Sequence, residues 1–336
     1  MNLKIDKIPN ENEIKKLYKV FPKEATVLEI SKIFGISIDE VFGLLEIFKY
    51  FGYSFEVKEI NDEIIISKEK KNNYYSNKKI KPSIDECTKF TIGVVSDTHL
   101  CSKEQQLHML NTAYRFFYEN EIDTVYHCGD VVDGDYAERR KSQLYSRFMH
   151  GVKEQSDYVI DMYPYVEGIK THFIQGSHDE THKINGGAIL GEIIQKNRKD
   201  MIYEGQDVAD VFNHKVKIRL RHPGGGVSKY RSRSIQNTID NMPSKMKAKL
   251  LLEGHYHKSY YLNYRNVHGV LVPCLCYQSQ FMQKKDISNI MGYYVIDIYC
   301  DEKGNIQYIT PKEKLFTEDE VKKNDFIKTK RLVIKH

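Results

Sequence analysis

Residues 89–99 read KFTIGVVSDTH, an apolar run that ends in an aspartate and a histidine. The run TIGVVS has the composition of a strand buried inside a sheet. Asp97 and His99 follow it directly, with only Thr98 between them. Because the loops at strand ends commonly carry binding and catalytic residues, this stretch predicts a site at the edge of a sheet.

Further apolar runs along the chain end in the same kinds of side chain. They are TVYHCG before Asp130, THFIQG before Ser177 and His178, KIRLR before His222, and LLLEG before His255 and His257. Segments with helical spacing, such as residues 103–120 and 186–197, separate several of these runs. Strands that alternate with helices form sheets covered by helices, so the pattern predicts an α/β fold.

Aspartates and histidines that converge at one sheet edge suit the hydrolysis of phosphate esters. Two divalent cations about 3.5–4 Å apart activate a water and neutralise the growing charge on the phosphoryl group. Mixed carboxylate and imidazole ligands favour Mn, Fe or Zn over Ca and Mg. Singly, each side chain has an ordinary explanation, such as an aspartate in a turn. Together, the groups at five strand ends favour a metal site.

In order and wording, these motifs resemble the calcineurin-like metallophosphoesterases over about residues 89–300. The resemblance implies a two-sheet αββα sandwich and a centre of two divalent ions. We expect both ions to be manganese, with iron or zinc as alternatives. The resemblance assigns the ligands by matching position. The first ion takes Asp97, His99 and His257, Asp130 bridges both ions, and the second takes Ser177, His222 and His255.

The resemblance also implies two residues that act on the substrate side. His178 protonates the leaving oxygen or binds the phosphate, and Asp133 of GDVVD orients His178. Ser177 departs from the family pattern, which usually has Asn there. Its hydroxyl is a shorter, neutral ligand, so we expect the second ion to bind more loosely. The alternative is that Ser177 marks a site that has lost its function.

The residues after the bridging aspartate narrow the choice of substrate. Protein phosphatases of this family usually carry Asp-Arg-Gly, whereas this chain reads Asp133-Gly134-Asp135, which argues against a phosphoprotein substrate. The branch of double-strand-break repair nucleases fits better, so we predict a DNA nuclease or exonuclease. Lys229, Arg231 and Arg233 form either a basic lip for a polyanion or the start of a surface helix. A phosphodiesterase for cyclic nucleotides or other small substrates and a non-catalytic metal-binding scaffold stay open.

The chain divides by composition into four predicted parts. Residues 1–67 resemble a winged helix, 68–88 form a basic linker, 89–310 form the phosphoesterase domain, and 311–336 form a basic tail. The third predicted helix, IDEVFGLLEIFKYFG, offers only Lys49 as a base-reading side chain. A protein partner is therefore as plausible for the first part as DNA.

Bulk composition indicates a cytoplasmic protein without a membrane segment. No apolar run approaches the ~20 residues of a membrane span, and the charged N-terminus lacks a signal peptide. A net charge of +5 permits a nucleic-acid partner without requiring one, and the oligomeric state stays open. The cysteines show no CxxC spacing, so we predict buried free thiols rather than zinc ligands or disulfides. They are Cys87, Cys101, Cys128, Cys274, Cys276 and Cys300.

Overall fold

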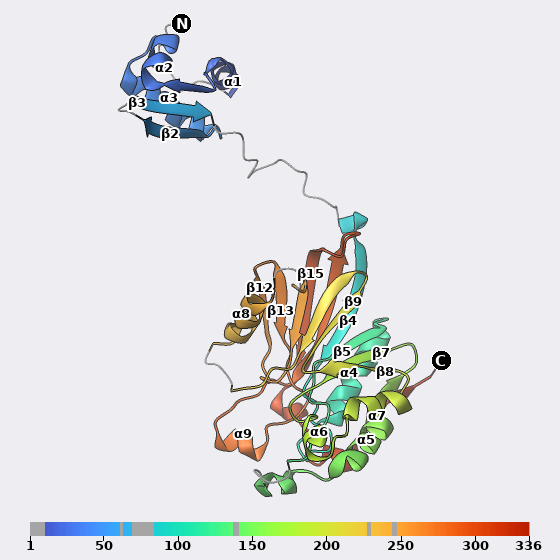
Figure 1. The fold of residues 1–336 in the computed structure, drawn as a ribbon. Coiled ribbons are helices and arrows are strands. Elements are labelled where there is room, and N and C mark those ends of the chain that lie inside the picture. The colour runs from blue at the N-terminus through green and yellow to red at the C-terminus, as the bar shows by residue number, and fades with distance from the viewer. Residues whose placement is uncertain are drawn as a thin grey trace. The chain divides into compact units, whose positions relative to one another are not determined.

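The structure, a computed structural model, describes residues 11–60, 63–68, 84–136, 141–226, 230–243 and 247–335. Contacts divide the chain into two units, Met1–Lys81 and Pro82–His336 (Figure 1). Most of the predicted linker, residues 69–83, lies outside the described residues. Among the described helices, none combines the length and the apolar character that a membrane crossing requires.

The N-terminal unit combines three helices with a small antiparallel sheet in the order β1-β3-β2. Its elements are α1 (Glu11–Val20), β1 (Glu24–Thr26), α2 (Val27–Phe34), α3 (Ile38–Tyr50), β2 (Phe55–Ile60) and β3 (Glu63–Lys68). Residues 61 and 62, between β2 and β3, lie outside the described residues. Helices and hairpin enclose one apolar core in which Phe21, Phe34 and Phe48 are buried.

Local sequence fixes the helix ends of this unit. Thr26 and Ser37 each begin a helix with a capping box, in which the hydroxyl and a glutamate three residues later satisfy each other's backbone amides. Gly35 ends α2 in the left-handed region, at φ 64°, where glycine lacks the steric penalty of a side chain.

Two sheets packed face to face form the centre of the second unit. The six-stranded sheet has the order β15 (Ile306–Leu315), β14 (Gly292–Cys300), β4 (Thr88–Val95), β5 (Thr124–His127), β7 (Lys170–Gln175) and β8 (Met201–Gln206). The five-stranded sheet has the order β12 (Tyr260–Tyr264), β13 (Val267–Leu271), β11 (Leu250–Glu253), β10 (Val216–Arg221) and β9 (Val208–Asn213). Ile92 and Val94 of β4 and Ile218 and Leu220 of β10 share the core between the sheets.

Helices cover the outer face of each sheet (Figure 1). The six-stranded sheet is covered by α4 (Leu107–Glu119), α5 (Gly151–Met162) and α7 (Leu190–Asn197), and the five-stranded sheet by α8 (Ser232–Asn241). The predicted αββα sandwich is thereby confirmed. Shorter helices lie in the connections: η1 (Ile84–Glu86), η2 (Lys141–Ser146), α6 (Thr181–Gly186) and α9 (Gln280–Lys284).

The C-terminal segment corrects one prediction. Residues 311–335 are not a solvated tail, because they continue β15 and then form η4 (Glu318–Glu320), α10 (Asp325–Lys328) and β16 (Val333–Ile334), which pairs with β6 (Tyr165–Val166). Leu332 and Ile334 pack against the helix-side core. The lysines Lys330 and Lys335 on either side of these apolar positions are exposed, so the segment has the composition of a solvated tail although its backbone is anchored.

Candidate metal centre

The strands that carry the predicted ligands run in the same direction. Strands β4, β5 and β7 pair in parallel in one sheet, as β10 and β11 do in the other. Their carboxyl ends therefore meet at one end of the sandwich. The loops there hold five predicted ligands in the left-handed backbone region, which side chains rarely adopt. They are Asp97, His99, Asp130, His255 and His257, with φ between 40° and 79°.

The first cluster joins Asp97, His99 and His257. The Nε2 atoms of His99 and His257 are 3.3 Å apart. Asp97 Oδ1 lies 3.3 Å from His257 Nε2 and 3.9 Å from His99 Nε2. Burial alone would raise the pKa of Asp97, but the neighbouring His257 holds that pKa well below its ordinary value. These donor atoms surround one point at the spacing that a single cation needs.

The second cluster joins Asp130, His222 and His255, whose ligand atoms lie within 4.8 Å of one another. His222 Nδ1 donates a hydrogen bond to the carbonyl of Cys128 at 2.8 Å, so Nε2 is the ring atom that is left to take a cation or a proton. That buried Nε2 has no hydrogen-bond partner among the described residues and lies 3.0 Å from Asp130 Oδ2. His255 Nε2 bonds the carbonyl of Gly225, which leaves Nδ1 as its ligand atom.

These donors fit divalent cations in three respects. First, the buried Nε2 atom of His222 has no hydrogen-bond partner among the described residues, and a bound cation would supply one. Second, burial alone would lower the pKa of His222, but Asp130 raises it to about 10, which reflects excess negative charge. Third, glycine lets the loops approach, since a Cβ on Gly176 would lie 2.4 Å from Asp130 Oδ1. Asp130 also lies 3.8 Å from His99 Nε2 and thus contacts both clusters.

His178 and Asp133 lie beside the shared aspartate. The backbone amide of His178 donates to Asp130 Oδ1 at 2.8 Å. Its Nδ1 donates to the carbonyl oxygen of Asp133 at 2.9 Å, while the Asp133 carboxylate is 3.5 Å away. The same carboxylate lies 3.4 Å from His99 Nδ1, so Asp133 contacts both imidazoles. Burial alone would lower the pKa of His178, but Asp130 and Asp133 raise it to about 9.

Ser177 is partly buried in the same loop. It stands between Gly176 and His178, and both neighbours lie against Asp130. The structure therefore brings all nine predicted site residues to one end of the sandwich. Their assigned roles stay predictions.

Three further residues at this end lie outside the predicted set of site residues, and of these only Asp179 was expected from the sequence, as a supporting or loop residue next to His178. Asp179, next to His178 in GSHD, is fully buried and accepts hydrogen bonds from the amides of Val131, Val132 and Gly176. It thereby ties the two ligand loops together. Its position next to His178 in the motif was the signal for this supporting role.

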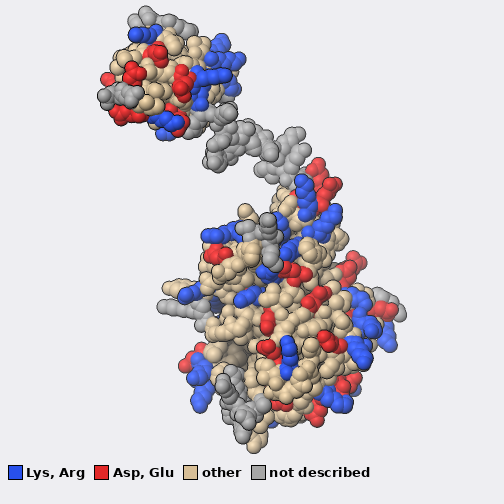
Figure 2. Space-filling model, viewed as in Figure 1, with Lys and Arg blue, Asp and Glu red and all other residues tan. Residues whose placement is uncertain are grey.

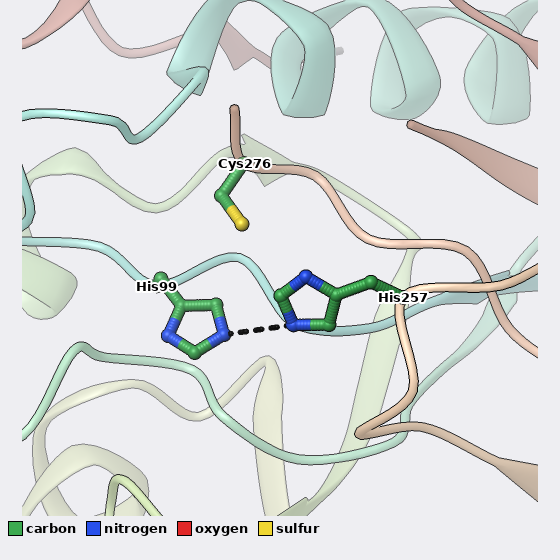
Figure 3. A group of neighbouring side chains, drawn as sticks. All are labelled: His99, His257 and Cys276. Atoms are coloured by element: carbon green, nitrogen blue, oxygen red, sulfur yellow. Dashed lines mark hydrogen bonds between the residues drawn. The ribbon is translucent and has the colours of Figure 1, made fainter. Parts of the chain in front are cut away.

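Arg147 and Cys276 had no such signal. Arg147 is buried, and its Nε lies 3.2 Å from Asp133 Oδ2, so it holds the carboxylate that faces His99. Cys276 lies in a group with His99 and His257 whose ligand atoms are within 4.8 Å of one another (Figure 3). Both residues reach the centre from distant parts of the chain.

A family model described as calcineurin-like phosphoesterase matches residues 90–329. This range covers most of the chain and contains both clusters. The chain belongs to the calcineurin-like phosphoesterases. It is accordingly a phosphoester hydrolase, and the predicted family resemblance is confirmed at this level. Among curated proteins, no relative matches.

Solved structures similar to this calcineurin-like phosphoesterase are distant. An archaeal phosphodiesterase is 17% identical with a TM-score of 0.39, over 68% of this chain and 100% of that chain. A predicted phosphoesterase from Streptococcus pneumoniae is 14% identical with a TM-score of 0.33, over 68% and 99%. A 5'-nucleotidase precursor from Thermus thermophilus is 10% identical with a TM-score of 0.36, over 72% and 57%. The family match carries the identification.

Proposed function

We propose that this phosphoesterase hydrolyses phosphodiester bonds of DNA at a centre of two divalent cations. The single observation that carries the two-cation centre is the position of Asp130. Its Oδ2 lies 3.8 Å from His99 Nε2 in one direction and 3.0 Å from His222 Nε2 in the other. A carboxylate shared between two imidazole clusters suits a bridging ligand. Mixed oxygen and nitrogen donors suit manganese, iron or zinc, and of these we propose manganese.

Bound cations supply charge neutralisation and an activated water in hydrolases of this kind. The chain's own residues then do the remaining work. His178 holds a proton on Nδ1, where Asp133 accepts it, and so directs Nε2 to the site. We propose that Nε2 donates a proton to the leaving oxygen. Asp133 fixes the orientation of both His178 and His99, and Arg147 fixes Asp133.

A basic cavity of about 440 Å³ supports a polyanionic substrate. Arg219, Arg221 and Arg233 line it, together with Tyr256, which lies between the ligands His255 and His257. Arg219 is held by Asp210 at 2.6 Å and Arg221 by Glu253 at 2.7 Å. Pre-organised guanidinium groups bind phosphates well, so this cavity suits a phosphate that neighbours the reacting one.

The basic character is local rather than a continuous stripe. Figure 2 shows Lys and Arg interspersed with Asp and Glu over the visible face of the second unit. Of the predicted basic lip, Lys229 lies outside the described residues, whereas Arg233 lines the cavity. We therefore propose that DNA affinity depends on this cavity and on the metal centre.

Cleavage of end-labelled single- and double-stranded DNA in the presence of manganese tests the proposed activity. We expect products from the wild-type protein and none from His178→Ala. Cleavage that persists unchanged in His178→Ala would come from a contaminant. Turnover of bis-p-nitrophenyl phosphate without DNA cleavage would favour a small-substrate phosphodiesterase. Purified protein that binds no metal would favour a scaffold.

We propose that the N-terminal unit, which we interpret as winged-helix-like, recruits a protein partner. The exposed positions of α3 include Asp39, Phe42, Glu46 and Tyr50, which are acidic or apolar. DNA-reading helices instead expose Arg, Lys, Asn or Gln. Lys49→Glu tests the assignment of a protein partner, because DNA affinity in a filter-binding assay should stay unchanged.

We also propose that the protein is located in the cytoplasm. Its free cysteines fit that reducing compartment.

A further inference from the structure

We propose that Cys276 supplies a thiolate ligand to the first cation. This inference rests on the proposed two-cation centre. The ligand atoms of Cys276, His99 and His257 lie within 4.8 Å of one another. Figure 3 shows the sulfur directed toward the space between the two imidazole rings. All three residues are buried, with exposed fractions of 4%, 6% and 8%.

The two imidazoles provide evidence for a cation that is independent of the cysteine. Their Nε2 atoms face each other at 3.3 Å, and Asp97 Oδ1 lies 3.3 Å from one of them. Two ligands about 2.1 Å from a tetrahedral ion stand roughly 3.4 Å apart, so one ion fits between these atoms. The sulfur therefore lies beside a preformed pair of nitrogen donors.

The backbone holds Cys276 in this position. The amide of Leu275 donates to the carbonyl of Asp97 at 3.1 Å, which joins the cysteine segment to the ligand loop itself. The amide of Tyr277 donates to the carbonyl of Glu104 at 2.8 Å on the other side. Because both flanking amides are fixed, the backbone that carries the sulfur is held against the ligand loop.

Cys274, two residues away, is the other thiol close to this position and serves as a comparison. It is equally buried, but its thiol contacts the carbonyls of Ile290 and Cys276 at 3.3 and 3.4 Å. The amide nitrogen of Asn289 also lies 3.5 Å from its sulfur. Cys274 thus has backbone and amide partners for its thiol and also contacts His257, whereas Cys276 forms a group with both His99 and His257.

Ligation changes the chemistry of the first position. The thiol of Cys276 releases its proton to water, and a sulfur electron pair forms the bond to the cation without any change in oxidation state. A soft thiolate favours Zn, Co or Fe(II) over Mn and Mg. The second position has only oxygen and nitrogen donors from Asp130, His222 and His255. The centre should therefore hold a thiophilic ion first and a harder ion second.

Anaerobic loading of the full chain with Co²⁺ tests this proposal. We expect a sulfur-to-cobalt charge-transfer band in the near ultraviolet for the wild type and Cys274→Ser, and its loss in Cys276→Ser. By calorimetry, Cys276→Ser should bind Zn²⁺ at the first site about tenfold or more weaker, with little change for Mn²⁺. X-ray absorption of the zinc-loaded wild type should show a sulfur neighbour at about 2.3 Å, independently of any variant.

Different failures of this test have different meanings. Two bound cobalt ions without a charge-transfer band or a sulfur neighbour would overturn the ligand and leave the two-cation centre intact. A band that survives in Cys276→Ser but disappears in Cys274→Ser would assign the ligand to Cys274 and overturn the proposal. A wild type that binds no cation would overturn both this proposal and the proposed function.

Discussion

The two units of this protein differ in how many of their described side-chain-bearing residues adopt positive φ. Among the described residues of the N-terminal unit, only Gly35 and Gly52 adopt positive φ. In the phosphoesterase unit, Asp97, Asp130 and His257 are among the side chains held at positive φ. Such strain persists only where the surrounding structure enforces it, and it concentrates at functional sites. The N-terminal unit thus has capped helices and no strained side-chain residues among those described, whereas the phosphoesterase unit holds unfavourable backbone conformations at its predicted ligands.

The largest expected effect is on Asp130, where the strain and both clusters meet. Asp130→Asn removes the charge that lies 3.0 Å from His222 Nε2 and 3.8 Å from His99 Nε2. We expect phosphodiester hydrolysis to fall roughly a thousandfold, because several kcal/mol of transition-state stabilisation depend on the cations. Metal analysis should show reduced occupancy. Full activity with two bound ions would contradict the shared role of Asp130.

A smaller loss should follow when the ligand loops are loosened without removing a ligand. Asp179→Ala leaves the amides of Val131, Val132 and Gly176 without their acceptor. We expect activity to fall about 10- to 100-fold, as for other residues that position ligands. Excess metal should restore part of the activity of Asp179→Ala but not that of Asp130→Asn. Equal rescue of both variants would place Asp179 among the ligands.

Asp130 and Asp179 also show which parts of the site could be predicted from the sequence. Asp130 was predictable because it directly follows an apolar run, and the run, the glycine and the carboxylate are adjacent in the chain. Asp179 was undervalued because its importance depends on amides 47 and 48 residues away. Arg147 and Cys276 lie in no sequence motif that would have predicted their place at the site. Sequence patterns encode strand ends, whereas tertiary folding decides which distant side chains meet there.

The C-terminal segment tests the same distinction through stability. Asp325 is buried and caps the N-terminus of α4 from a distant part of the chain. It accepts hydrogen bonds from the amides of Leu107 and His108 at 2.6 and 3.3 Å. Asp325→Ala should reduce the free energy of opening α4 by about 1–2 kcal/mol. Hydrogen exchange would show this loss in α4, with α2 and α3 unchanged. Unchanged protection would mean that the segment does not stabilise α4.

The effect of Asp325 depends on pH. Burial alone would raise the pKa of Asp325, but hydrogen bonds from His108, Thr329 and Leu107 lower it below its ordinary value of 3.8. A carboxylate with a lowered folded pKa stabilises the protein fully above pH 3.8 and loses that contribution as pH falls below it. The difference between wild type and Asp325→Ala should therefore be present above pH 3.8 and narrow as pH falls below it.

Ser177 sharpens the comparison within the metal centre. Ser177→Asn restores the longer amide ligand that the family usually has at this position, so we expect the second cation to bind about tenfold more tightly. Calorimetric titration with Mn²⁺ should show the second binding event move while the first stays fixed. A second event that weakens would indicate that the loop has adapted to the hydroxyl. In that case, Asp179, which accepts a hydrogen bond from the Gly176 amide, would hold the loop in a position that suits serine.

The smallest effect belongs to the N-terminal unit. Ser37→Ala removes the hydroxyl that accepts from the Glu40 amide at the start of α3. We expect a loss of about 1 kcal/mol, seen as faster hydrogen exchange in α3, because a cap contributes locally. Glu46→Ala, an exposed change in the middle of the same helix, should have less effect. Turnover of a small phosphodiester should not change in either variant, since strain and chemistry reside in the other unit. A fall in that turnover would show that the two units are energetically coupled.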